Sequence, residues 1–142
     1  MAPAQTSLLA KLDTQQRVRD FLTNAVASGR ASHAYLFLGA PGAGKLDAAW
    51  ALAQAFLCEQ DGCGSCDSCV RVARHTHPDV HYYTPESATG YLIAQTRELL
   101  DDVPLAPIRA KAKVYIIDRA EQLRANTANA PVSYTHLTLP TT

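Results

Sequence analysis

The 142-residue chain lacks several features that would place it in a specialised class. It has no excess charge of either sign, with 13 basic and 13 acidic residues. It therefore has no overall attraction to nucleic acid, and any association with DNA is expected to be indirect or confined to a local patch. Its apolar residues make up 47% of the chain, but they are too interrupted for a membrane span. We find no internal repeat and no low-complexity linker.

Two further absences concern the amino terminus and the cysteines. The opening residues, MAPAQTSLLAKLDTQQRV, lack the basic segment and apolar run of a secretory signal. Cysteine is absent from the whole chain except one short segment, residues 58–69. Clustered thiols in a chain without an export signal indicate metal binding and not disulfides. We therefore expect a cytoplasmic protein that does not associate with a membrane.

Apolar periodicity and turn residues predict an alternation of helices and strands. Gly29 and Pro104 are the expected ends of the first and last helices. Strands separated by helices pair in parallel, so the predicted fold class is α/β, with a parallel sheet and helices on its faces. The expected helices are 15–27, 46–57, 67–74 and 92–103, and the expected buried strands are 34–38, 80–83 and 113–117.

Residues 39–45, GAPGAGK, fit the first seven positions of the phosphate-binding P-loop, G-x-x-x-x-G-K-[ST]. Gly39, Gly42 and Gly44 would let main-chain N–H groups curl around phosphate oxygens, and the helix that follows directs its positive end at them. Lys45 would reach the outer phosphates. ATP could therefore bind here, and a glycine-rich turn without a ligand is the alternative.

Two positions argue against hydrolysis. Leu46 stands where a P-loop has the Ser or Thr that ligates Mg²⁺, and an aliphatic side chain offers no oxygen. Residues 114–118, VYIID, look like a Walker B strand, in which Asp118 would hold Mg²⁺ through water; a strand-end carboxylate that caps the next helix is the alternative. Active ATPases of this type usually have a glutamate next. Here it is Arg119, which cannot act as a base.

The cysteine spacing predicts a structural zinc site. Two overlapping C-x2-C turns and a fourth cysteine at the end of the preceding helix can close a tetrahedron and leave no open position. Four unligated thiols and a [4Fe–4S] cluster are the alternatives. His75 and His77 follow the segment, and we expect turn residues there because a four-cysteine set is complete. The proposed ligands are Cys58, Cys63, Cys66 and Cys69.

A P-loop followed at once by a four-cysteine insertion, and then by a Walker B strand, resembles the bacterial clamp-loader AAA+ subunits of DNA polymerase III. The resemblance covers roughly residues 14–130 and is strongest to the delta-prime branch. The turn THPDV best distinguishes the two branches, because gamma/tau subunits usually have a different sequence there. The similar stretches are SHAYLFLGAPGAGK (32–45), CGSCDSC (63–69), THPDV (76–80) and KVYIIDRAEQLRANTANA (113–130).

The resemblance implies a P-loop AAA+ domain with an incomplete sheet over residues 1–130, and a zinc-knuckle insertion at 58–69. It also implies a non-hydrolysing member of a pentamer with delta and gamma/tau subunits, which loads the sliding clamp onto primed DNA. An ATP-hydrolysing gamma/tau-type subunit is the alternative. A zinc-dependent nucleic-acid-binding module is disfavoured, because residues 58–69 contain no Lys, Arg or aromatic.

The segment 131–142, PVSYTHLTLPTT, departs from the family pattern. Residues 132–141 can be encoded by GTC TCT TAT ACA CAT CTG ACG CTG CCG ACG, which matches a transposon-end adapter of sequencing libraries. We therefore expect a non-native, adapter-encoded tail, and a flexible native tail is the alternative. On this interpretation the strand before the P-loop lacks its two later partners. The exposed sheet edges would make the isolated chain aggregated or molten.

Overall fold

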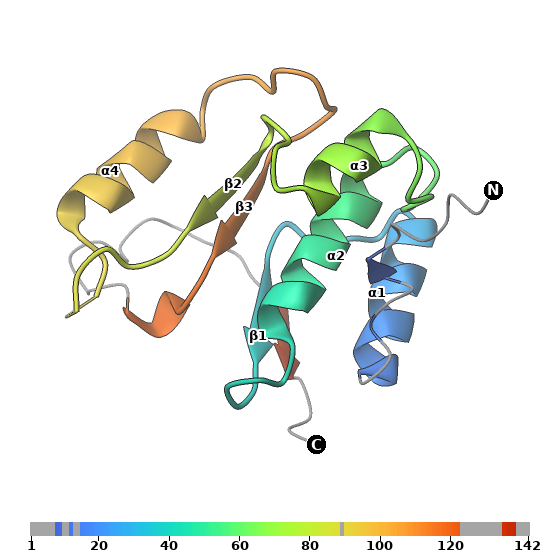
Figure 1. Ribbon diagram of the computed structural model, residues 1–142, viewed down its shortest axis with the longest axis horizontal. Coiled ribbons are helices and arrows are strands. Elements are labelled where there is room, and N and C mark those ends of the chain that lie inside the picture. Colours follow the sequence, from blue (N-terminus) through green and yellow to red (C-terminus); the bar gives the residue numbers. More distant parts are fainter. Residues whose placement is uncertain (1–7, 10–11, 13–14, 89, 123–134, 139–142) are drawn as a thin grey trace. The chain divides into compact units, whose positions relative to one another are not determined.

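The computed structural model describes residues 8–9, 12, 15–88, 90–122 and 135–138 (Figure 1). The chain divides into two compact units, the first made of residues 1–77 and 133–142 and the second of residues 78–132. Each unit combines helices with a two-stranded parallel sheet. No helix in the described ranges has both the length and the apolar character that crossing a bilayer requires.

The described residues of the first unit form three α-helices and one sheet. Its helices are α1 (Gln16–Ala27), α2 (Lys45–Leu57) and α3 (Asp67–Ala73). Strand β1 (Tyr35–Leu38) pairs in parallel with β4 (Thr135–Thr138). The loop that carries the P-loop sequence therefore connects a sheet strand to the amino terminus of α2.

The core of the first unit lies between α1 and α2. Val18 and Leu22 stand one turn apart on α1 and are 2% and 0% exposed. They belong to the same buried cluster as Ala48 and Ala51 of α2, whose small side chains permit close approach of the two helices. Phe21, on the same helix, is 47% exposed.

Helix α1 ends as its glycine predicts. Gly29 has φ of 71°, in the left-handed region. Its N–H donates to the carbonyl of Val26 at 3.1 Å, and the N–H of Arg30 donates to the carbonyl of Ala25 at 2.9 Å. This pair of bonds is the Schellman arrangement, which satisfies carbonyls at a helix end and requires a residue that tolerates positive φ.

The second unit contains β2 (Val80–Tyr83), α4 (Ile93–Asp102), β3 (Val114–Ile117) and the short 3₁₀ helix η3 (Ala120–Gln122). Strands β2 and β3 pair in parallel, with Val80 opposite Val114. Their connection passes through α4, as a parallel pair requires.

A buried carboxylate holds the loop that leads into β3. Asp79 is 0% exposed, and its two oxygens accept the main-chain N–H groups of three successive residues at 2.6–2.7 Å. Its own carbonyl accepts the N–H of Val114 at 2.8 Å, at the start of β3. Asp79 thus connects the turn before β2 to the turn before β3. The donors are Ile108, Arg109 and Ala110.

A second carboxylate joins α4 to the sheet. Asp102, the last residue of α4, accepts from Nζ of Lys113 at 3.0 Å and from the hydroxyl of Tyr115. His81 Nε2 lies 3.4 Å from the same oxygen. The Tyr115 hydroxyl and the Lys113 ammonium hold the pKa of Asp102 below its usual value.

Every helix and strand expected over residues 15–117 is present, with bounds that differ by at most one residue. Two expectations are corrected. The strands are only partly buried, with Leu38 40% exposed and Ile116 buried at 5%. This follows from the two-stranded sheets, in which each strand has one unpaired edge in the described part of the chain. In addition, β1 has a partner, because β4 comes from the segment 131–142.

Candidate metal centre and phosphate loop

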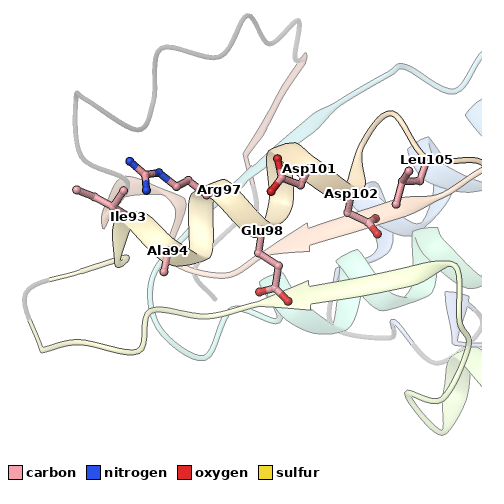
Figure 2. A pocket seen from close by; sticks show the side chains of 7 residues that line it. All are labelled: Ile93, Ala94, Arg97, Glu98, Asp101, Asp102 and Leu105. Atoms are coloured by element: carbon pink, nitrogen blue, oxygen red, sulfur yellow. The ribbon is translucent and has the colours of Figure 1, made fainter.

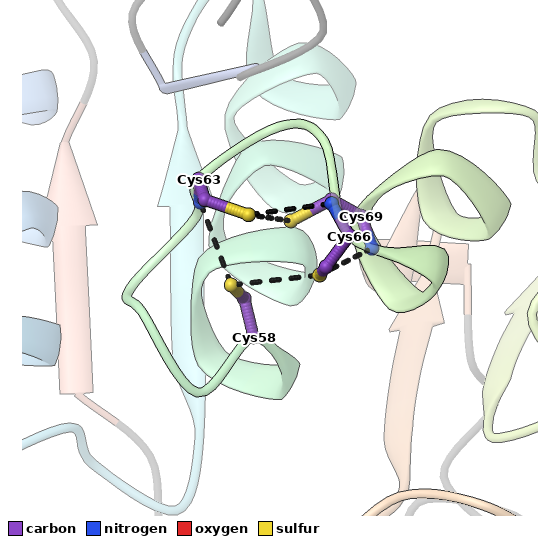
Figure 3. Close-up of side chains that lie close together, drawn as sticks. All are labelled: Cys58, Cys63, Cys66 and Cys69. Atoms are coloured by element: carbon purple, nitrogen blue, oxygen red, sulfur yellow. Dashed lines mark hydrogen bonds between the residues drawn. The ribbon is translucent and has the colours of Figure 1, made fainter. Parts of the chain in front are cut away.

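The four cysteines converge on one point in the first unit (Figure 3). Their sulfur atoms all lie within 4.8 Å of one another. Sγ of Cys58 and Cys66 are 3.8 Å apart, and Sγ of Cys63 and Cys69 are 4.0 Å apart. These separations are about twice the ~2.05 Å of a disulfide bond, so the thiols are free. The cluster can bind a metal ion.

Two helix ends and the loop between them place these side chains. Cys58 is the residue at which α2 ends, and its N–H still donates to the carbonyl of Gln54. Cys66 caps the amino terminus of α3, where its sulfur accepts the N–H of Cys69 at 3.4 Å. Gly62 has φ of 97°, and a Cβ there would lie 3.3 Å from Cα of Ala55. The turn therefore needs glycine both for its conformation and for its close approach to α2.

Main-chain N–H groups surround the sulfurs. Sγ of Cys58 accepts from Gln60 at 3.2 Å and from Cys63 at 3.4 Å. Sγ of Cys63 accepts from Ser65 at 3.4 Å and from Cys66 at 3.3 Å. Hydrogen bonds to the charged form stabilise a thiolate, so the loop conformation prepares these sulfurs to act as anionic ligands.

The pKa is lowered for two of the four thiols and raised for the other two. N–H donation by Ser65, with its hydroxyl, lowers the pKa of Cys63 to about 6. Burial raises the pKa of Cys58, but the N–H groups of Cys63 and its neighbours outweigh that effect, and the net pKa is lowered. Burial raises the pKa of both Cys66 and Cys69. A cation among them would stabilise all four thiolates, because it opposes their mutual repulsion and their burial.

A buried glutamine fixes the metal-binding loop to the rest of the unit. The side chain of Gln54 is 1% exposed. Its Nε2 donates to the carbonyl of Cys69 at 3.0 Å, and its Oε1 accepts the N–H of Leu8 at 2.8 Å. One side chain on α2 thus binds both α3 and the segment before α1. Sequence inspection missed this residue, because a glutamine in an alanine-rich helix gives no signal of its own.

The two histidines after the cluster have other roles. The ring of His75 stacks on that of Trp50, with centroids 3.8 Å apart and an angle of 8° between the planes. His75 also has φ of 59° and ends α3 with the same pair of bonds that ends α1, since the N–H of Thr76 donates to the carbonyl of Arg71. His77 is buried. The metal-ligand cluster in the described residues consists of cysteines alone.

The P-loop sequence forms a turn that leads directly into α2. Gly42 and Gly44 have φ of 85° and 93°, so both require a residue that accepts positive φ. Gly44 caps α2, and its carbonyl accepts the first helical N–H, from Ala48. The amide of buried Gln15 donates to the carbonyl of Ala43 at 2.9 Å and steadies the turn from outside. Lys45 is half-buried at the first position of the helix.

The other predicted nucleotide-site residue, Asp118, belongs to the second unit, at the end of β3. Its Oδ2 accepts the hydroxyl of Tyr82 at 2.9 Å. Its N–H donates to the carbonyl of Tyr83 at 2.8 Å, and the hydroxyl of Tyr91 contacts its carbonyl. Sequence analysis missed Tyr82 as the partner of this carboxylate and Tyr91 as the partner of the main-chain carbonyl.

Arg119 follows with φ of 51°. A positive φ is unfavourable for a side chain of this size. Its Nη2 donates to the hydroxyl of Thr84 at 3.0 Å. The guanidinium therefore extends toward Thr84, the residue after β2. A general base needs a lone pair that can accept a proton, and a guanidinium offers only N–H donors.

The second unit also carries a shallow groove of about 630 Å³ along α4 (Figure 2). Ile93 and Leu105 lie at its two ends, and they are 48% and 60% exposed. None of the residues predicted to bind metal or phosphate lines it. Between its ends the groove is lined by Ala94, Arg97, Glu98, Asp101 and Asp102.

Fold and cluster together define a mixed α/β protein with a four-cysteine metal-binding loop placed directly after the helix of a glycine-rich turn. Comparison with known proteins is consistent with that class. The sequence profile described as "DNA polymerase III, delta subunit" matches residues 14–131. The chain belongs to the DNA polymerase III delta-prime/gamma-tau family.

Individual relatives come from both branches. The chain is 38% identical to the DNA polymerase III subunit delta' of Bacillus subtilis, over 86% of this chain and 38% of that protein. It is 38% identical to subunit tau of Escherichia coli, over 82% of this chain and 18% of that protein. It is 34% identical to subunit gamma/tau of Mycobacterium tuberculosis, over 85% of this chain and 22% of that protein. The chain thus spans well under half the length of these relatives.

Proposed function

We propose that this chain is part of a delta-prime-like subunit of the DNA polymerase III clamp loader, which loads the sliding clamp during DNA replication without hydrolysing ATP itself. The observation that carries the proposal is the four-thiol cluster at the end of the P-loop helix. The delta' relative supports this branch, because it shares slightly more of the chain than tau does. An ATP-hydrolysing gamma/tau-type subunit is the alternative.

In this proposal the cluster holds a structural zinc ion. Zn–S bonds of about 2.3 Å place the sulfurs of a tetrahedral site about 3.8 Å apart, and the observed pairs are 3.8 and 4.0 Å apart. A [4Fe–4S] cluster fits less well, because a cube of iron and sulfide between the cysteines would separate their sulfurs further. Bound zinc would neutralise the thiolates and tie the end of α2 to the start of α3.

The P-loop AAA+ fold is the architecture we propose for residues 1–130. The turn at Gly42 and Gly44 leads straight into α2, and the positive end of that helix would favour a phosphate group there. Lys45 at the start of α2 would contact the outer phosphates of ATP, and Asp118 stays the proposed Walker B residue by sequence. Leu46 and Arg119 occupy the positions of a magnesium ligand and a catalytic base and can act as neither.

Reconstitution tests this proposal. The subunit would be assembled with delta and gamma/tau subunits, the sliding clamp and primed DNA, and DNA-stimulated ATP turnover would be measured with wild-type protein and with Lys45→Ala. We expect turnover to change less than twofold, because the other subunits supply the hydrolysis. Turnover by the purified subunit alone, abolished in Lys45→Ala, would favour the gamma/tau alternative.

We also propose that residues 131–142 are adapter-encoded. The family match stops at residue 131, where the departure from the family pattern begins. The pairing of β4 with β1 is compatible with either origin, because Thr135 and Thr138 are β-branched residues that favour extended backbone. Sequencing the source gene decides the question: a genomic read that continues in frame through PVSYTHLTLPTT refutes the adapter origin.

A further inference from the structure

The carboxylate of Asp118 already has a partner within its own unit. Tyr82 lies opposite Ile116 in the parallel pair, and Asp118 follows Ile116 by two positions. Side chains two apart on a strand point to the same face of the sheet, so Tyr82 and Asp118 are diagonal neighbours on one face. The 2.9 Å bond from the Tyr82 hydroxyl to Oδ2 follows from this register.

Four further hydrogen bonds hold the same end of the sheet. The Tyr91 hydroxyl, on a side chain that is 4% exposed, contacts the main-chain carbonyls of Tyr83 and Asp118. The N–H of Asp118 donates to the carbonyl of Tyr83 at 2.8 Å. Arg119 reaches back to the hydroxyl of Thr84. The ends of β2 and β3 are therefore joined through side chains as well as through the main chain.

These contacts do not fit a magnesium site. A carboxylate that receives Mg²⁺ or its bound water needs oxygens that are open to the cation. Here Oδ2 of Asp118 accepts a hydrogen bond from the Tyr82 hydroxyl, which is protonated at neutral pH. Burial and this hydrogen bond raise the pKa of Tyr82 further. The residue next to Asp118 is a cation, Arg119, which would repel a second cation.

We propose that Asp118 is a structural hydrogen-bond acceptor, held by Tyr82 across the β2–β3 pair, and not a ligand of a nucleotide-bound divalent cation. Tyr82 is then a positioning residue that keeps the carboxylate away from metal. The inference rests on the proposed function. It gives a third reason, beside Leu46 and Arg119, why this chain would bind phosphate without hydrolysing ATP.

A double-mutant cycle tests the bond. Tyr82→Phe and Asp118→Ala each remove one partner, and each is expected to lower Tm by about 2–5 °C. The double variant is expected to lower Tm no more than the larger single change, because both remove the same interaction. Tyr83→Phe is the matched control. It removes the hydroxyl of the neighbouring residue, whose side chain points to the opposite face, and its effect should add to that of Asp118→Ala.

A cation titration tests the consequence. The affinity of a fluorescent, non-hydrolysable ATP analogue would be measured with and without Mn²⁺, for wild type and for Asp118→Ala. We expect Mn²⁺ to change the two affinities by the same factor, within twofold. A tenfold or greater loss of the Mn²⁺ effect in Asp118→Ala, or additive Tm shifts for Tyr82→Phe with Asp118→Ala, overturns the inference. If no nucleotide binds at all, the proposed phosphate role fails, and the cycle alone decides the role of Asp118.

Discussion

The side-chain amide of Gln54 donates to the main-chain carbonyl of Cys69 at 3.0 Å, and both groups are buried. Gln54 stands on the helix that begins at the P-loop turn, one turn before that helix ends at Cys58. The phosphate loop and the metal centre therefore lie at opposite ends of one helix, and a single side chain joins that helix to the second half of the metal centre. Removal of the proposed zinc ion would be expected to loosen α2, the helix that begins at Lys45.

Gln54→Ala should strongly destabilise the first unit. It leaves the buried carbonyl of Cys69 and the partly buried N–H of Leu8 without these partners, and it opens a cavity in the core. We expect a loss of about 2–4 kcal/mol in the free energy of unfolding, measured by chemical denaturation. Gln60→Ala, at an exposed glutamine close by, is the control and should change stability by less than about 0.5 kcal/mol. Equal effects of the two variants would contradict this role.

Replacing a thiol should weaken metal binding far more than replacing a neighbour of a thiol. Cys69→Ser removes a buried sulfur from the proposed tetrahedron, so its zinc affinity should fall by more than the roughly 10–100-fold typical of outer-shell changes. Ser65→Ala removes only a hydroxyl 3.6 Å from Sγ of Cys63 and should stay within that range. Competition with a chelator of known affinity measures both. The same affinity for the two variants would show that Cys69 is not a ligand.

Asp79→Ala should release the loop before β3. The substitution removes the buried acceptor of three consecutive main-chain N–H donors, for a loss of about 3–5 kcal/mol. Amide hydrogen exchange should accelerate first at Ile108, Arg109 and Ala110. Asp101→Ala, at an exposed acid of α4, is the control and should leave those amides protected. Unchanged exchange in Asp79→Ala would refute the role of this carboxylate.

Asp102 should make the second unit sensitive to acid. Its pKa is held below the usual value by Tyr115 and Lys113, with His81 also close. A depressed folded-state pKa gives stability that is fully present above the unfolded-state pKa, near 4, and is lost as pH falls through the folded-state value. Asp102→Asn should therefore lower Tm at pH 6, and this difference should shrink below about pH 4. Parallel Tm curves for wild type and Asp102→Asn from pH 6 to pH 2 would contradict the assignment.

The local structure was predictable from sequence because its signals are local. Gly29 ends α1 through its positive φ, and the spacing of the cysteines fixes the loop between α2 and α3. The pattern also predicted β2 with its observed bounds and β3, the apolar run VYII, to within one residue.

The contacts that hold these elements together were not predictable in the same way. Gln54, Asp79 and Tyr82 each bond to atoms far away in sequence, and no spacing rule marks them. His75 takes a left-handed conformation that would favour glycine, and its stacking on Trp50 is visible only in three dimensions. The pairing of β1 with β4 also involves a segment that sequence reasoning set aside.

Cobalt substitution tests the central claim most directly, that the four cysteines form one tetrahedral thiolate metal site. The purified chain would be freed of metal with a chelator and titrated with Co²⁺ under reducing conditions. We predict binding of one ion per chain, with intense thiolate-to-cobalt charge-transfer bands and the visible absorption of tetrahedral Co²⁺, and displacement of both by one equivalent of Zn²⁺. Absence of these bands at saturating Co²⁺, or their full retention in Cys69→Ser, would contradict the account.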